Sequence, residues 1–147
     1  MAASHEVLFV ISNATAITMK YISHTFDSGR LDESEQWPNQ ITPDGNPNKI
    51  ICVDKNNALA GVSGSVTYAF RGVQITIGFS NPFWGTNKYS IVTGGHKDAM
   101  NALDDYGYGS HTTELTIDEH VKIKVIGSVT KGDVNRLNLA FQSTQAW

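Results

Sequence analysis

The chain has 147 residues, of which 40% are hydrophobic and 17% are charged, and its net charge is −3 at neutral pH. These values predict one globular domain spanning residues 1–147, large enough to bury a core without metal ions, and the single cysteine, Cys52, excludes an intrachain disulfide. The acidic balance excludes the clustered basic face of a nucleic-acid-binding protein and the polybasic patch that attracts anionic lipids.

The N-terminal segment predicts a first strand and no targeting signal. Its apolar run covers only Val7 to Ile11 and lacks the preceding basic stretch of a secretory signal. No segment reaches the roughly 18 apolar residues that span a bilayer as a helix. We therefore expect a soluble protein that leaves the producing cell by a non-standard route and acts at the membrane of a target cell.

Most of the chain alternates apolar and polar residues with a period of two, which is typical of half-buried β-strands. Val73, Ile75, Ile77 and Phe79 share one face, and Arg71-Gly72 before them predicts a tight hairpin turn after residues 66–70. The other predicted strands are residues 6–12, 15–25, 49–53, 88–93, 112–117, 120–129 and 135–142. This pattern predicts an all-β fold, a single-domain antiparallel β-sandwich with at most one short helix, around residues 97–103.

Aromatic side chains gather in the three long loops, which are residues 35–48, 81–87 and 94–111. Phe83 and Trp84 stand between a proline and a glycine, where turn residues are normally polar. Phe83 can plug the open end of the sandwich, or both rings can form a tip that lies at the depth of lipid headgroups. The candidate membrane- or lipid-binding residues are Phe83, Trp84, Lys88, Tyr89, Tyr106, Tyr108 and Trp37.

Catalytic signatures are missing from the sequence. It has no GxSxG elbow, P-loop or dinucleotide fingerprint, and its five histidines are scattered without metal-ligand spacing. Cys52 lies in a strand-like apolar run, which predicts a buried, inert thiol. We therefore expect neither enzymatic activity nor a cofactor nor a bound metal ion.

A central stretch of the chain resembles a known family. Residues 61–89, GVSGSVTYAFRGVQITIGFSNPFWGTNKY, resemble the centre of the aegerolysins, most closely the small component of bacterial binary insecticidal toxins. NPFWGTNKY carries most of this likeness, and VLFVISNAT, SGRL and SHTT support it. The resemblance covers about residues 6–117 and does not extend to residues 121–147.

The resemblance implies a β-sandwich that recognises membrane lipids such as sphingolipids and acts with a larger pore-forming partner, perforin-like or of another type. Trp84 matches the tryptophan that follows a proline in the loop of the fungal members. Two other membrane-facing tryptophans of those members fall near Glu6 and near Asp27-Ser28, which are not aromatic, so the lipid preference of those members does not carry over. The alternative is a lectin-like, carbohydrate-binding module that uses the loop aromatics, and self-association remains open.

Overall fold

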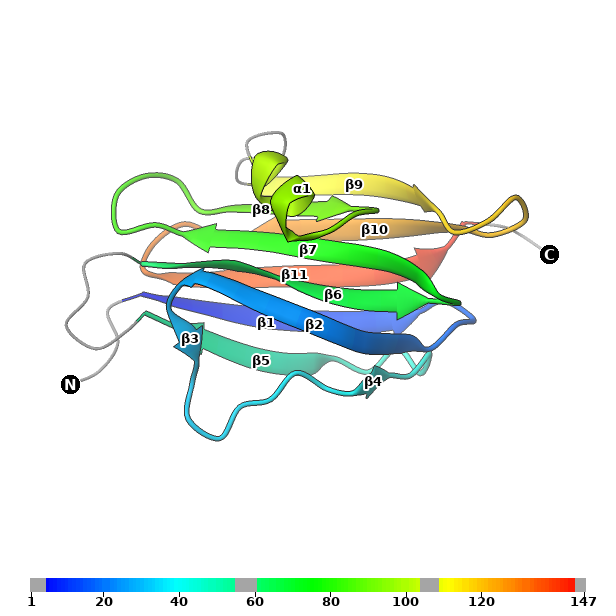
Figure 1. Ribbon diagram of the computed structural model, residues 1–147, viewed down its shortest axis with the longest axis horizontal. Coiled ribbons are helices and arrows are strands. Elements are labelled where there is room, and N and C mark those ends of the chain that lie inside the picture. The colour runs from blue at the N-terminus through cyan, green and yellow to red at the C-terminus, as the bar shows by residue number, and fades with distance from the viewer. Residues whose placement is uncertain (1–4, 55–60, 104–108, 145–147) are drawn as a thin grey trace.

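The computed structural model describes residues 5–54, 61–103 and 109–144 (Figure 1). Strands dominate these ranges, and one short helix, α1 (His96–Asn101), accompanies them. The strands are β1 (Glu6–Ala14), β2 (Met19–Ser28), β3 (Arg30–Leu31), β4 (Gln40–Ile41), β5 (Asn48–Val53), β6 (Val62–Phe70), β7 (Val73–Asn81), β8 (Lys88–Val92), β9 (Gly109–Thr116), β10 (Lys122–Val129) and β11 (Val134–Ser143). No helix in the described ranges is long and apolar enough to cross a membrane.

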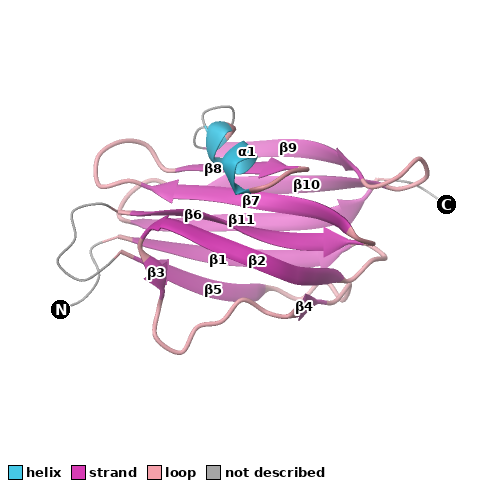
Figure 2. Ribbon diagram, in the orientation of Figure 1, coloured by secondary structure: helices cyan, strands magenta, loops and turns pink. Residues whose placement is uncertain are grey.

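The strands form two sheets that pack face to face, which confirms the predicted β-sandwich (Figure 2). The six-stranded sheet has the order β3-β5-β1-β11-β10-β9, and the five-stranded sheet has the order β4-β2-β6-β7-β8. Alternate residues of both sheets point inward, as the period-two pattern requires. The ring of Phe9 in β1 meets that of Phe79 in β7 edge-on, with 4.9 Å between the ring centroids.

One strand pair departs from the predicted antiparallel arrangement. β1 and β11 run parallel, from Glu6 beside Val134 to Ala14 beside Gln142. Parallel neighbours need a long crossover connection, and here the whole five-stranded sheet lies between them in the sequence. The predicted pattern of apolar residues does not depend on strand direction, so it could not show this pairing.

The predicted strand at residues 15–25 begins later in the structure, at Met19. Asn13 causes this shift, because its side chain bonds to the backbone that follows it. Its Oδ1 accepts hydrogen bonds from the Thr15 amide at 3.0 Å and the Thr15 hydroxyl at 2.7 Å, and its Nδ2 donates to the Ile17 carbonyl at 2.8 Å. Such local bonds compete with strand pairing and stabilise a turn.

The predicted hairpin turn at Arg71-Gly72 is confirmed. Both residues have positive φ, 49° and 80°, as a two-residue turn of type I′ requires. The turn places the β6–β7 hairpin at one end of the sandwich, so that the next connection, the β7–β8 loop, lies at the other end (Figure 1).

Helix α1 covers the outer face of the five-stranded sheet, near the predicted helical turn (Figure 1). Gly78 in β7 permits the close approach, because a Cβ there would lie 3.0 Å from the carbonyl oxygen of Ala99 in the helix. The hydroxyl of Ser90 donates a hydrogen bond of 2.6 Å to the same carbonyl.

Candidate functional site

Phe83 and Trp84 lie in the β7–β8 loop, at the same end of the sandwich as the β10–β11 turn (Figure 1). The Trp84 side chain is 85% exposed, more than any other large hydrophobic side chain among the described residues. Phe83 is half-buried, and its ring contacts that of Trp84 edge-on at a centroid distance of 5.2 Å. We call these two residues the aromatic tip. An exposed indole at a loop apex contributes nothing to the core, which points to a contact outside the molecule.

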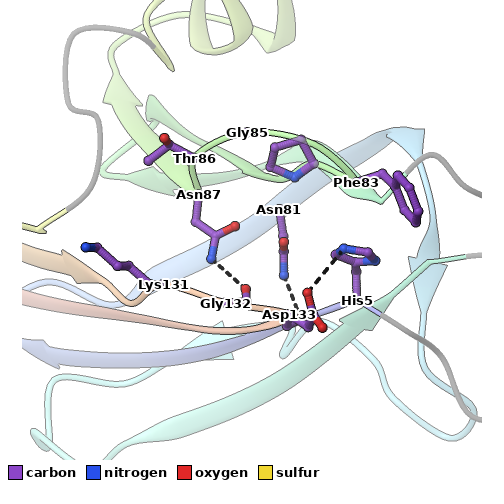
Figure 3. Close-up of a pocket in the computed structure, with 10 residues that line it drawn as sticks. His5, Asn81, Phe83, Gly85, Thr86, Asn87, Lys131, Gly132 and Asp133 are labelled. Atoms are coloured by element: carbon purple, nitrogen blue, oxygen red, sulfur yellow. Dashed lines mark hydrogen bonds and ion pairs between the residues drawn. The ribbon is translucent and has the colours of Figure 1, made fainter.

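Two buried asparagines fix the ends of this loop to the β10–β11 turn (Figure 3). Asn81 Nδ2 donates to the carbonyl oxygens of Glu6 at 3.0 Å and Asp133 at 2.8 Å. Asn87 Nδ2 donates to the carbonyl oxygens of Thr130 at 2.8 Å and Gly132 at 2.9 Å. Buried amides that satisfy backbone carbonyls in this way hold the loop in one conformation. The aromatic tip is therefore presented on a rigid base.

Gly61, directly before β6, packs against the backbone of the β7–β8 loop. It adopts φ +74°, and a Cβ there would lie 2.3 Å from the Asn81 carbonyl oxygen and 2.8 Å from the Phe83 amide nitrogen. Only glycine allows the start of β6 to pass so close to the loop backbone. The first glycine and the two asparagines of the sequence motif thus have structural roles.

A pocket of about 390 Å³, which we call the tip pocket, opens beside the aromatic tip (Figure 3). The β7–β8 loop forms one wall with Phe83 and Thr86, and the β10–β11 turn forms the other with Lys131 and Asp133. Lys131 and Asp133 are exposed and carry opposite charges. The pocket thus combines an aromatic surface, a cation and an anion, which suits a small ligand with both charged and apolar parts.

His5, directly before β1, completes the lining of the tip pocket. Its side chain is buried, with Nδ1 3.4 Å from Asp54 Oδ2 and Nε2 3.5 Å from Asp133 Oδ1. Its ring centroid lies 5.4 Å from that of Phe83, at an interplanar angle of 54°. The histidine therefore contacts both the charged side and the aromatic side of the pocket.

Two of the candidate membrane-binding residues, Trp37 and Tyr89, are buried in the core and not exposed as predicted. Trp37 is 6% exposed and packs edge-on against Phe9, with 5.2 Å between the ring centroids. Its loop folds back onto the sandwich, where the Tyr68 hydroxyl donates to the Pro38 carbonyl at 2.8 Å. Tyr89 is fully buried and points from β8 toward β10, where Gly127 leaves room for its ring. Neither ring can reach a membrane while the core is intact.

The remaining candidate membrane-binding residues are Lys88, Tyr106 and Tyr108. Lys88 is half-buried at the start of β8 and does not line the tip pocket. Tyr106 and Tyr108 lie outside the described residues. The structure therefore brings together Phe83 and Trp84 from the predicted set and adds His5, Lys131 and Asp133.

No sequence pattern indicates that these additional residues belong to the site. His5 stands alone before the first strand, and Lys131 and Asp133 are ordinary turn residues beside a glycine. Val134, which is 57% exposed, follows them at the same end of the sandwich and adds an apolar side chain near the turn. The pairing of β1 with β11 brings His5 beside the β10–β11 turn, and Asn81 joins both segments to the β7–β8 loop.

A second polar cluster has the residue types of a Ser–His–Asp triad. His96 Nδ1 lies 2.6 Å from the Ser65 hydroxyl, and His96 Nε2 lies 2.9 Å from Asp27 Oδ1. Ser65 is 2% exposed beneath α1, however, so a substrate carbonyl cannot reach its hydroxyl in this conformation. The cluster instead attaches the start of α1 to β2 and β6. In the described part of the chain, no group of three His, Cys, Asp or Glu side chains is placed to hold a metal ion.

The β-sandwich fold is shared with several solved structures. The lipid-binding protein Nakanori superposes with a TM-score of 0.75 at 18% identity, over 96% of this chain and 72% of that chain. RahU, solved in complex with a TRIS molecule, has a TM-score of 0.60 at 14% identity, over 99% and 100% of the two chains. The Xerocomus chrysenteron lectin XCL has a TM-score of 0.61 at 14% identity, over 94% and 99%.

At this level of identity the structural likeness shows a common fold. No protein-family model matches the sequence, and no curated protein matches it.

Proposed function

We propose that this domain binds membrane lipid through the aromatic tip and the tip pocket. The observation that supports this most directly is the Trp84 indole, 85% exposed at the apex of a loop whose two ends are fixed by buried asparagines. Tryptophan is enriched at membrane interfaces, where its apolar ring contacts the acyl region and its N–H hydrogen-bonds at the level of the headgroups. A rigid base keeps the loss of conformational entropy on binding low.

The aromatic tip alone gives weak attachment. A fully buried aromatic side chain gains roughly 4–6 kcal/mol from some 150–250 Å² of surface. Association costs about 4–15 kcal/mol in lost freedom of motion. A specific headgroup site, or several copies acting together, must therefore supply the rest.

The tip pocket offers such a headgroup site. Lys131 and Asp133 lie two residues apart on one turn and carry opposite charges, so together they complement a zwitterion. The chain as a whole carries a net charge of −3, which disfavours purely electrostatic binding to anionic lipids. Zwitterionic headgroups are the class that this combination supports, and a lipid-binding protein shares the fold.

The more specific role we propose is that of the lipid- or receptor-binding component of a binary, insecticidal cytolysin. Its support is the resemblance of NPFWGTNKY to the aegerolysins that act with a larger pore-forming protein. In this role the domain recognises the target membrane and recruits the partner, which forms the pore. Leakage of dye from vesicles is then expected only when both proteins are present.

Replacement of Trp84 by alanine tests the membrane contact. We expect Trp84→Ala to weaken binding to vesicles of phosphatidylcholine, sphingomyelin and cholesterol at least tenfold, since it removes most of the apolar surface of the tip. Co-sedimentation with vesicles measures the effect. Ile22→Ala is the matched control, because Ile22 is a 45% exposed apolar residue on β2, outside the tip. Equal binding of Trp84→Ala and the parent would show that the tip does not contact the membrane.

Carbohydrate binding is the second candidate function. The tip pocket places a carboxylate and a hydroxyl, from Asp133 and Thr86, beside the Phe83 ring, and sugars bind to such combinations. The lectin XCL shares the fold. A glycan array separates the two candidates: bound glycans whose signal disappears in Asp133→Ala favour this function, and an array without signal removes it.

A further inference from the structure

His5 joins the buried part of the molecule to the aromatic tip. It precedes β1, and its side chain is 7% exposed. One ring nitrogen faces Asp54, which is 1% exposed after β5, and the other faces Asp133 in the β10–β11 turn. The imidazole thus lies between two carboxylates from segments that are far apart in the sequence.

The same imidazole also supports the aromatic tip. Its ring packs against Phe83 at 5.4 Å, and Phe83 packs against Trp84 at 5.2 Å. The three rings form a continuous series from the edge of the core to the exposed indole (Figure 3 shows His5 beside Phe83 and Asp133). A change in how His5 is held therefore reaches Trp84 through direct contacts.

We infer that His5 is a positioning residue for the aromatic tip, and that its protonation strengthens membrane attachment. This inference rests on the lipid-binding function proposed above and adds a pH dependence to it. Histidine is the side chain whose charge ordinarily changes near neutral pH. The inference itself stands on the two carboxylate contacts and the ring contact.

Protonation changes the number of carboxylates that the ring can bind. A neutral imidazole carries one N–H and donates to one carboxylate at a time, whereas an imidazolium donates to both. At low pH the ring therefore binds Asp54 and Asp133 together and holds the β10–β11 turn against the core. At high pH the neutral ring donates to only one of the two carboxylates, so the link that it makes between the core and the β10–β11 turn weakens, and the turn and the aromatic tip loosen.

The lining of the tip pocket contains few charges besides His5 and Asp133. Among the described residues, the β10–β11 turn also brings Lys131 to the tip pocket, and the β7–β8 loop, residues 82–87, contains no titratable side chain. Asp133 is 79% exposed, so water screens its attraction to the imidazolium. We therefore expect an effect of about threefold on affinity, which is the range of ion pairs near a protein surface.

The test compares vesicle binding at about pH 5.5 and about pH 8.5, on either side of the ordinary imidazole titration. For the parent, the lipid concentration that gives half-maximal binding is expected to be about threefold lower at the acidic pH. His5→Gln keeps a side chain that donates a hydrogen bond but does not titrate, and its binding is expected to be the same at both pH values. His120→Gln is the matched control, because the His120 side chain is 80% exposed, with Nε2 3.3 Å from Glu119 Oε1. It belongs to the β9–β10 turn, which lies at the opposite end of the sandwich (Figure 1). The control variant is expected to keep the full pH dependence of the parent.

Asp133→Asn provides a second variant in case His5→Gln does not fold, since Asp133 is exposed. Asp133 also belongs to the proposed headgroup site, so this variant is expected to bind more weakly at both pH values, and the ratio between the two pH values is what is compared. Asp133→Asn too is expected to lose the pH dependence. A His5→Gln or Asp133→Asn protein that still binds threefold better at the acidic pH would overturn the inference.

A measurement on the free protein separates this inference from the proposed function. The indole N–H resonance of Trp84, assigned with Trp84→Phe, is expected to shift between the two pH values in the parent and to stay constant in His5→Gln. If the parent binds no vesicles at either pH but shows this shift, the lipid-binding function fails and the positioning role stands. A constant Trp84 resonance in the parent contradicts the positioning role, whatever the vesicles show.

Discussion

Asn81 and Asn87 determine how the aromatic tip is presented, although neither would contact a membrane. Each amide donates to two backbone carbonyls of neighbouring segments, and both side chains are buried. A shorter side chain at either position would leave two carbonyl oxygens without their donor. The geometry of the tip therefore depends on hydrogen bonds at the base of the loop more than on the rings at its apex.

Substitution of Asn87 tests this role. Asn87→Ala removes two buried hydrogen bonds, so we expect it to lower the free energy of unfolding by about 1–3 kcal/mol and to weaken vesicle binding as well. Urea unfolding measures the first effect. Asn101→Ala, at an exposed position in α1, serves as the control and should change stability by less than about 0.5 kcal/mol. A fully stable Asn87→Ala protein would contradict the role of the asparagines.

At the same scale, sequence reasoning recognised Phe83 and Trp84 as exceptional but misplaced Trp37 and Tyr89. The burial of Tyr89 follows from the strand pattern, because Tyr89 and Ile91 lie two residues apart in β8 and share its inward face. Trp37 lies in an irregular loop, where no periodicity indicates which way a side chain points. Cys52 is buried as predicted, and burial raises the pKa of its thiol, which keeps it protonated and unreactive.

At the scale of elements, α1 shows how closely a short helix can approach a sheet. Its backbone lies directly over Gly78, and the hydroxyls of Thr76 and Ser90 donate to carbonyls of the α1 segment, those of Gly94 and Ala99. A helix of six residues has little stability of its own, so these contacts hold it in place. The outer face of the five-stranded sheet is polar at this point because it binds the helix through hydrogen bonds.

Two glycines provide a matched pair for testing this packing. A Cβ at Gly78 would lie 2.5 Å from the Ser90 hydroxyl oxygen, whereas a Cβ at Gly95 would have no atom within 4 Å. We expect Gly78→Ala to destabilise the protein by about 1–3 kcal/mol through overpacking, and Gly95→Ala to change stability by much less. Thermal unfolding followed by circular dichroism measures both. Equal stability of the two variants would mean that α1 does not pack as described.

The elements themselves were largely predictable, but their pairing was not. The alternation of apolar residues located nine of the strands, because each buries one face in a shared core. β3 and β4 have two residues each, which is too short for any periodic signal. The parallel pairing of β1 with β11 depends on contacts across the whole chain, and this pairing brings His5 and the β10–β11 turn to the site.

At the scale of the whole molecule, the two ends of the sandwich differ. The aromatic tip, the tip pocket and His5 gather at one end, and the β6–β7 and β9–β10 turns lie at the other (Figure 1). If the end with the aromatic tip contacts a membrane, the long axis of the sandwich points away from the bilayer surface. The opposite end and the sheet faces then remain accessible to other proteins, which the proposed role in a binary system requires.

The most direct test of the account is the depth of Trp84 in a bilayer. Vesicles that contain lipids brominated along the acyl chains quench tryptophan fluorescence only when the indole reaches the acyl region. Both proteins carry Trp147→Phe, so that Trp37 and Trp84 are the tryptophans that fluoresce in the parent and Trp37 alone in Trp84→Phe. We predict quenching of this parent protein and little quenching of Trp84→Phe, because Trp37 stays buried in the sandwich. Vesicle-bound parent protein whose fluorescence is not quenched, or Trp84→Phe quenched as strongly as the parent, would contradict the account.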